Sequence, residues 1–174
     1  MTWLLPAAAF ALGAIVGSFL NVVIHRYPRG ESIVLPASHC PHCNTPIRPW
    51  DNVPIFSYLW LRGRCRACGE PISMRYPLVE LANALFYLAA FQRTGPTVGF
   101  LAIAALVSMT IALIYIDLDI QILPDVIDLP GVAIGLLIGA THLGASYPDL
   151  VLSRTLLESV TGAIVGAGIL MVIR

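Results

Sequence analysis

All four cysteines of the chain lie in two Cys-x-x-Cys pairs, an arrangement that can bind a metal ion. The first pair is Cys40 and Cys43 in CPHC, and the second is Cys65 and Cys68 in CRAC. Residues 44–64 separate the pairs, slightly more than in common zinc sites, yet four thiolates can still surround one ion tetrahedrally. We therefore predict a structural Zn2+ site, with two disulfides or free thiols as the alternatives.

The acidic stretch DLDIQILPD, residues 117–125, is a second candidate for chemistry. Asp117 directly follows an unbroken apolar run, so we expect its carboxylate to be desolvated and suited to acid–base catalysis. Asp125 is predicted to begin the next helix, where free backbone N–H groups favour a carboxylate. Asp119 and Asp128 are expected to be solvated or to adjust the local charge. A cation site made by these acids is the alternative.

The elements that must position these residues are predicted to be membrane helices. Hydrophobic residues make up 57% of the 174 residues and charged residues 11%, whereas soluble domains carry about 25% charged residues. The net charge is zero, which suggests no nucleic-acid partner. A spanning helix needs about 20 apolar residues, and five segments are predicted to span: Trp3–Ile24, Leu78–Phe91, Thr97–Ile116, Val126–Tyr147 and Thr155–Ile173.

The expected fold is therefore an all-α polytopic membrane protein with a small four-cysteine loop between its first two helices. Seven arginines lie within residues 25–77, whereas the opposite side holds only Arg93 and Arg154. The positive-inside rule then places residues 25–77 in the cytoplasm and the N-terminus outside.

This orientation bears on the cysteines and on the acidic stretch. A cytoplasmic loop lies in a reducing compartment, which disfavours disulfides and favours zinc. Four thiolates already close the site, so His39 and His42 are expected to remain surface residues and the metal to organise the loop rather than react. The acidic stretch also faces the cytoplasm.

Three motifs resemble one family. They are GSFLNVVIHRYP at residues 17–28, the segment from CPHC to RYPLVE at residues 40–80, and DLDIQILPD at residues 117–125. The chain resembles the type IV prepilin leader peptidases, which are membrane aspartic peptidases and N-methyltransferases of bacterial pilus and type II secretion systems. The resemblance implies cleavage of prepilin and pseudopilin leaders at the cytoplasmic face of the inner membrane. It also implies methylation of the new N-terminus by S-adenosylmethionine.

The resemblance assigns roles to particular residues. Asp117 stands seven residues before Pro124, which matches the family's first catalytic aspartate, and the four cysteines match the family's tetracysteine loop. Residues 1–92 then form an N-terminal domain linked to methylation, and residues 97–174 form an incomplete peptidase domain. No glycine-rich fingerprint marks a site for the methyl donor. Its candidate polar residues are Asn21, Arg75 and Glu80, followed by Arg26, Asp51 and Asn52.

The chain departs from the family at the second catalytic aspartate. That residue lies in a Gly-x-Gly-Asp motif, and an aspartic peptidase needs two carboxylates, but this sequence contains no Gly-Asp pair. We expect the chain to be a fragment, with a naturally shortened or degenerate homologue as the alternative. In either case we expect residues 1–174 alone to lack proteolysis. One alternative is a non-cutting module that recognises prepilin leaders through the zinc loop and the acidic turn. Another is an ion site or transporter element, which predicts paired polar residues near the bilayer midplane.

Overall fold

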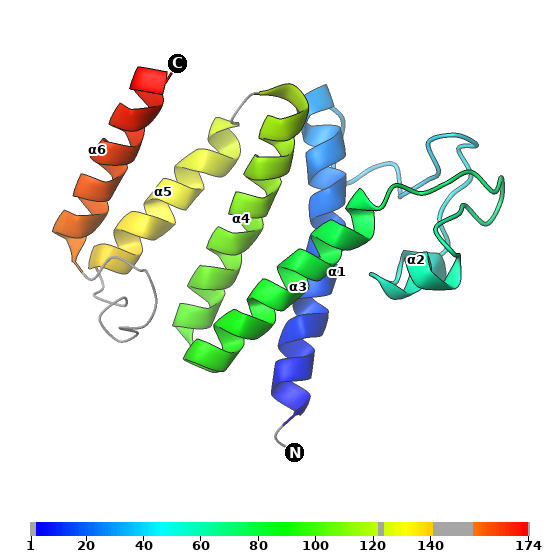
Figure 1. Cartoon of the computed structure of the whole chain (residues 1–174), viewed down its shortest axis with the longest axis horizontal. Coiled ribbons are helices and arrows are strands. Elements are labelled where there is room, and N and C mark those ends of the chain that lie inside the picture. The colour runs from blue at the N-terminus through cyan, green and yellow to red at the C-terminus, as the bar shows by residue number, and fades with distance from the viewer. Residues whose placement is uncertain (1–2, 122–123, 141–154, 174) are drawn as a thin grey trace.

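The computed structural model describes residues 3–121, 124–140 and 155–173. Every regular element in this part of the chain is a helix, which confirms the all-α prediction, and β structure there is limited to isolated bridges in the loop. In chain order the elements are α1 (Leu4–Arg26), η1 (Tyr27–Arg29), η2 (Pro49–Asn52), α2 (Phe56–Trp60), α3 (Arg75–Thr94), α4 (Val98–Ile120), α5 (Asp125–Ala140) and α6 (Leu156–Ile173) (Figure 1).

In the described ranges, two segments are long and apolar enough to cross a bilayer, judged by length and composition. They are Leu4–Arg29, which contains α1 and η1, and Val98–Ile120, which is α4. The α5 helix has 16 residues in the structure, fewer than the roughly 20 that a span needs. The other three predicted spans therefore stay predictions.

The end of α4 differs from the sequence prediction. The helix was expected to end at Ile116, but it continues to Ile120 and includes Asp117 and Asp119. Gln121 caps the helix: it adopts a left-handed conformation and donates its N–H to the Asp117 carbonyl at 2.8 Å. The first two acids of the stretch therefore lie on a helix rather than in a turn.

Glycines of α1 set the closest helix contact. A Cβ atom built on Gly13 would lie 2.8 Å from Cα of Ala84, and one on Gly17 would lie 2.7 Å from Cα of Glu80. Real Cβ atoms do not approach other atoms so closely, so α1 and α3 pack at this distance because both positions are glycine. The tight packing places the middle of α1 directly against the first turns of α3.

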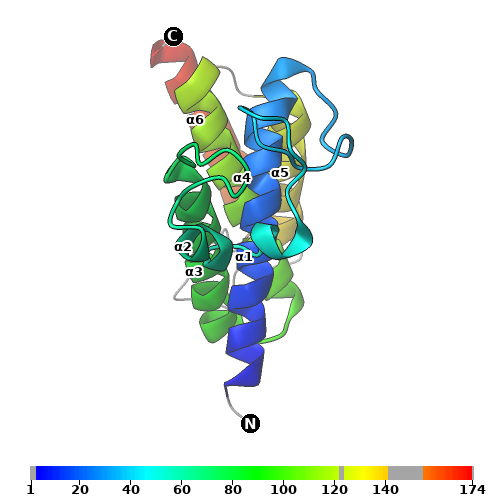
Figure 2. The same ribbon diagram turned by 90° about the vertical axis from the view of Figure 1, so that its right-hand side faces the viewer.

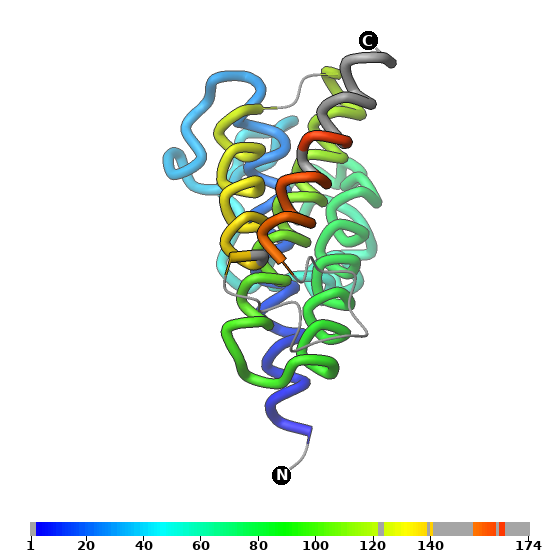
Figure 3. Tube along the Cα trace, turned by 90° about the vertical axis from the view of Figure 1, so that its left-hand side faces the viewer, coloured from blue at the N-terminus to red at the C-terminus, as the bar shows by residue number. Residues whose placement is uncertain are grey.

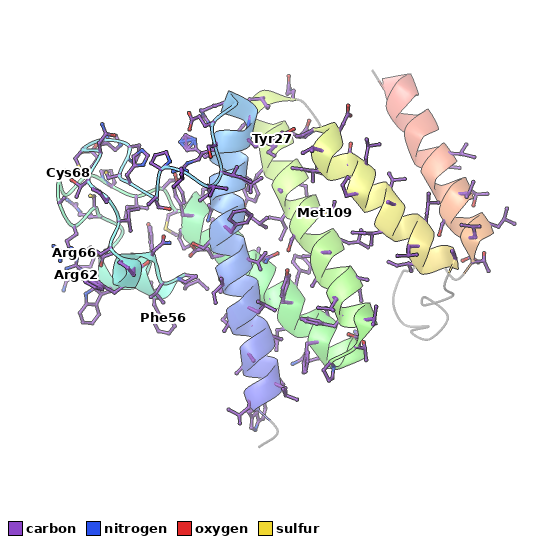
Figure 4. The ribbon with its side chains drawn as sticks, turned by 180° about the vertical axis from the view of Figure 1, so that it is seen from behind. Tyr27, Phe56, Arg62, Arg66, Cys68 and Met109 are labelled. Carbon is purple, nitrogen blue, oxygen red and sulfur yellow. The ribbon has the colours of Figure 1, made fainter. Side chains whose placement is uncertain are left out.

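Two apolar clusters form the core between α1, α3 and α4. Their buried members are Ala9, Leu20, Ile24, Val79, Tyr87, Ala90, Phe100, Ala104, Ile111, Ala112 and Ile116. Next to α4 lies α5, and α6 packs on α5 (Figure 1). Met109 of α4 points towards α5, with its terminal methyl 3.6 Å from the Cβ position of Gly131 (Figure 4).

Buried polar side chains in this core bind one another. The Asn83 amide donates to the Gly13 carbonyl at 2.7 Å and accepts from the Ser108 hydroxyl at 3.1 Å, and Ser108 and Tyr87 share a 2.9 Å hydrogen bond. Because an unsatisfied buried polar group is costly, this network favours a single register of the three helices.

The long segment between α1 and α3 lies on one side of the bundle. Figure 2 shows it in front of α1 and α3, and Figure 3 shows α5 and α6 on the opposite side. The end of α1, the end of α4 and the start of α5 lie at the same end of the molecule (Figure 1). Asp117 and Asp119, in the last turns of α4, therefore lie at the end of the molecule where the loop leaves α1.

Candidate functional site

The four predicted metal ligands meet in one cluster. The sulfur atoms of Cys40, Cys43, Cys65 and Cys68 all lie within 4.8 Å of one another, and all four are free thiols rather than disulfides. The Cys40 and Cys68 sulfurs are 3.9 Å apart, and Zn–S bonds of about 2.3 Å in a tetrahedron require S···S distances of about 3.8 Å. The donor set and its geometry therefore fit a structural zinc ion.

The two Cys-x-x-Cys pairs have the same pattern of backbone hydrogen bonds, at positions that are 25 residues apart in the sequence. In the first, the Cys40 N–H binds the Thr45 carbonyl, and the Asn44 N–H binds the Cys40 carbonyl. In the second, the corresponding pairs are Cys65 with Glu70 and Gly69 with Cys65. The bridges His39–Pro46 and Arg64–Pro71 close the two turns at matching positions. The relation between CPHCNTPI and CRACGEPI is visible in the sequence once the two segments are aligned.

Each turn requires a residue that tolerates a positive φ angle. Asn44 has φ +54° and its counterpart Gly69 has φ +75°. Glycine adopts this conformation without cost and asparagine at less cost than most residues. These residue types let the chain reverse after the second cysteine of each pair, so both thiols of a pair face the same point.

Hydrogen bonds and neighbouring thiols shift the pKa values of Cys43, Cys65 and Cys68 in different directions. The hydrogen bonds with Thr45 lower the pKa of Cys43 to about 6, and backbone N–H groups of Cys68 and its neighbour lower the pKa of Cys65. At Cys68 the hydrogen bond with the Glu70 backbone lowers the pKa, but desolvation and the other thiols outweigh it and raise the pKa to about 12. A divalent cation bound at the cluster would favour the thiolate form of its cysteine ligands.

The two histidines beside the first pair stay outside the cluster. Within the described residues the metal-ligand group contains the four cysteines alone. Nδ1 of His39 lies 3.1 Å from the Ala37 carbonyl, and His42 is exposed. His42 therefore matches the prediction of a surface residue, whereas His39 is half-buried although it does not join the metal-ligand group.

A salt bridge joins the second pair of cysteines to η2. Arg66 donates two hydrogen bonds to the Asp51 carboxylate, at 2.8 and 2.6 Å, and its guanidinium lowers the pKa of that carboxyl group. Figure 4 shows Arg66 and Cys68 in the loop, on the far side of α1 from α5 and α6.

A cavity of about 830 Å³ lies between the loop, α1 and the start of α3. Asn21 and Glu80, two of the predicted methyl-donor residues, line it, together with Arg26, Asp51 and Asn52. The Asn21 amide also donates to the Tyr76 carbonyl at 3.1 Å. Ligand cavities commonly have volumes of about 300–1,000 Å³, so this space is large enough for a small molecule or a peptide end.

Arg75, the third predicted methyl-donor residue, lies elsewhere. It donates to both Asp119 oxygens at 2.7 and 2.9 Å and to the Tyr115 carbonyl at 3.0 Å, and its guanidinium stacks 4.6 Å above the Tyr115 ring. These contacts tie the first turn of α3 to the last turns of α4. They also provide a physical reason why α4 continues past Ile116, and local sequence does not reveal them.

Asp117 is exposed on the last turn of α4. The other described residues therefore do not cover its side chain, and the expected desolvation at the lipid edge stays a prediction. Its predicted catalytic role likewise stays a prediction. Asp125 is the first residue of α5, as expected, and the Pro124 carbonyl accepts the N–H groups of Ile127 and Asp128.

Comparisons with known proteins find consistent relatives. The model of the bacterial peptidase A24 N-terminal domain matches residues 11–94. A prepilin leader peptidase/N-methyltransferase from Aeromonas hydrophila is 41% identical over 172 residues, covering 83% of this chain and 59% of the relative. One from Klebsiella pneumoniae is 42% identical over 163 residues, covering 90% and 68%. One from Myxococcus xanthus is 49% identical over 127 residues, covering 73% and 38%.

The chain thus spans 38–68% of the length of these three relatives. No solved structure matches the chain. The family match covers most of α1, the loop and α3, and so includes all four cysteines and Glu80.

Proposed function

Because the chain belongs to the prepilin leader peptidase/N-methyltransferase family, we propose that it processes type IV prepilins and prepilin-like secretion proteins. The observation that carries this proposal is the cluster of four thiols, within 4.8 Å of one another, inside a segment that the family model matches. The proposed substrates are prepilins whose leaders are removed at the cytoplasmic face of the inner membrane and whose new N-terminus is then methylated.

In this proposal zinc has a structural role. Cys40, Cys43, Cys65 and Cys68 would hold the ion and fill its coordination sphere, which leaves no open position for a substrate or a water molecule. The bound ion would keep the loop folded beside the cavity that Glu80 and Asn21 line. S-adenosylmethionine is the proposed methyl donor, and residues 1–92 are proposed to form the region linked to methylation.

Methyl transfer can be tested separately from cleavage. A peptide that already begins with a free phenylalanine needs no peptidase, so labelled S-adenosylmethionine should transfer its methyl group to that peptide in the presence of the purified, zinc-loaded chain. A matched sample stripped of metal by a chelator serves as the control. Failure of the loaded chain to label the peptide would contradict the proposed methyltransferase activity.

For cleavage, Asp117 is proposed as the first catalytic carboxylate. Two features support this role: its spacing from Pro124, and its exposed position on the last turn of α4, which leaves it accessible to a substrate. Residues 1–174 contain no Gly-Asp pair for the second carboxylate, so we propose that they do not cut prepilin by themselves. Robust cutting by the purified chain that Asp117→Ala abolishes would refute this.

A second candidate function is a module that binds prepilin leaders without cutting them. The exposed position of Asp117 favours it, because a basic leader would approach an accessible carboxylate. A synthetic leader peptide should then bind the chain and lose affinity with Asp117→Asn. Equal binding by both proteins would exclude this function.

The proposed topology places residues 25–77 in the cytoplasm and the N-terminus outside. Support comes from the arginines of the loop and from the common end of the molecule at which α1 and α4 finish (Figure 1). Reporter fusions after residue 60 and at the N-terminus test it, and a periplasmic signal from the loop fusion would contradict it.

A further inference from the structure

Glu80 is a buried carboxylate without a positively charged partner in the described part of the chain. Its residue exposure is 8%, and the ion pairs found there are Arg66–Asp51 and Arg75–Asp119. The nearest basic residue in its own helix, Arg75, is thus already paired. The partners of Glu80 are the Ile55 N–H, 2.7 Å from Oε2, and the Ser18 hydroxyl, which are neutral groups.

The loop backbone is bent towards this carboxylate. Ile55 has φ +64°, a conformation that is strained for a β-branched residue and that persists only where the surroundings enforce it. The Ile55 N–H that meets Glu80 comes from this strained residue. The hydrogen bond therefore joins Ile55 of the loop to Glu80 of α3.

The carboxylate lines the cavity of about 830 Å³. Among the other charged residues on that wall, Arg26 donates to the carbonyls of Ser32 and Pro36 at 3.1 and 2.8 Å, and Asp51 binds Arg66. Arg48 lies 5.8 Å over the Trp50 ring, and Glu70 adds a second carboxylate. A buried charge without a counter-charge is costly, and a cation entering the cavity would supply one in surroundings of low dielectric constant.

We propose that Glu80 receives a positively charged group of a methyl-transfer reactant in this cavity. The cation is a sulfonium or a primary ammonium, as carried by S-adenosylmethionine and by the N-terminus of a processed pilin. The inference rests on the proposed methyltransferase function and assigns to Glu80 the recognition of the cation.

Binding measurements with charged and uncharged ligand pairs test the proposal. S-adenosylhomocysteine lacks the sulfonium charge, and an N-acetylated peptide lacks the ammonium of a peptide that begins with phenylalanine. The zinc-loaded wild-type chain in lipid nanodiscs should prefer the charged member of at least one pair by about tenfold. Which pair shows the preference identifies the cation.

The variant Glu80→Gln keeps an oxygen that accepts the Ile55 N–H but removes the charge. It should lose about tenfold in affinity for the charged ligand while binding the uncharged ligand as the wild type does. Glu31→Gln is the matched control, because it makes the same change at an exposed carboxylate that does not line the cavity; its preference should equal that of the wild type.

Several outcomes overturn the proposal. The first is that the wild type binds the charged and the uncharged ligand of both pairs with equal affinity. The second is that Glu80→Gln loses affinity equally for both ligands of a pair, which would indicate a purely structural role for Glu80. If the wild type binds neither S-adenosylmethionine nor the peptide, the proposed methyltransferase function itself fails. If the wild type binds these ligands but does not prefer the charged ones, the proposed methyltransferase function is not contradicted and only the proposed role of Glu80 is rejected.

Discussion

The four-cysteine loop between α1 and α3 and the helical core of this protein are stabilised by different means. Between α1 and α3 large apolar side chains remain exposed, including Trp50 and Trp60 at 62% and 80%, and order comes from tight turns and four converging thiols. In the core, Val79 and Ala84 are fully buried, and α1 and α3 touch through glycines. A short segment that buries little apolar surface depends on its ion, whereas the core depends on packing.

The two regions meet through a few polar contacts. The Ile55 N–H binds Glu80 of α3, and Arg26 at the end of α1 donates to the carbonyls of Ser32 and Pro36 in the loop. With so small a junction, damage to one region should leave the other largely intact. The following predictions test that independence.

The largest effect is expected from Cys40→Ser. It removes one of four thiolates, and structural zinc in small sites contributes apparent binding free energies of about 10–16 kcal/mol. The variant should lose the roughly one zinc per chain expected of the wild type and expose the loop to protease, while helix content by circular dichroism persists. His42→Ala, next to the site, should retain its metal. Full zinc content in Cys40→Ser would contradict the site.

Gly17→Val should damage the core instead. The new Cβ would lie 2.7 Å from Cα of Glu80, so α1 and α3 must separate, at a cost of about 3 kcal/mol. We expect a lower free energy of unfolding in detergent with zinc content unchanged. Gly135→Val is the matched control, because no atom lies within 4 Å of a Cβ at that position. Equal destabilisation by the two variants would show that the glycine contact is unimportant.

Asn83→Ala should have a smaller effect on the same core. It leaves the Gly13 carbonyl without its side-chain donor and removes the oxygen that accepts from Ser108, which costs about 2 kcal/mol for buried groups. The midpoint of unfolding by denaturant should fall, whereas Asn52→Ala, at an exposed amide of the loop, should leave it unchanged. No difference between the two would mean that the network does not stabilise the bundle.

Arg66→Gln should have the smallest effect. Arg66 lowers the pKa of the Asp51 carboxyl below the ordinary 3.8, so the stabilisation from this pair is present above that value and is lost as the pH falls through the lowered pKa. In the variant the pKa of Asp51, measured by NMR titration, should rise towards 3.8 with little change in stability at neutral pH. An unchanged pKa would contradict the salt bridge.

Local sequence patterns were sufficient for several features. The Cys-x-x-Cys spacing predicted the sulfur cluster because two such turns each present two thiols to one point. The length of the apolar runs predicted α1 and α4. A helix forms all its backbone hydrogen bonds within one segment, so the composition of that segment is enough to indicate it. The α4 boundary was missed because Arg75, more than forty residues away, binds the last turns of that helix.

What the sequence by itself determined is the set of residue types and their local spacing: the four cysteines, the helical segments, and the distance from Asp117 to Pro124. Only the tertiary structure decided which charges are paired and which are buried. It leaves Asp117 exposed, pairs Arg75 with Asp119, and buries Glu80 against the Ile55 N–H. Burial and pairing depend on segments distant in the chain that pack together, and no local pattern contains that information.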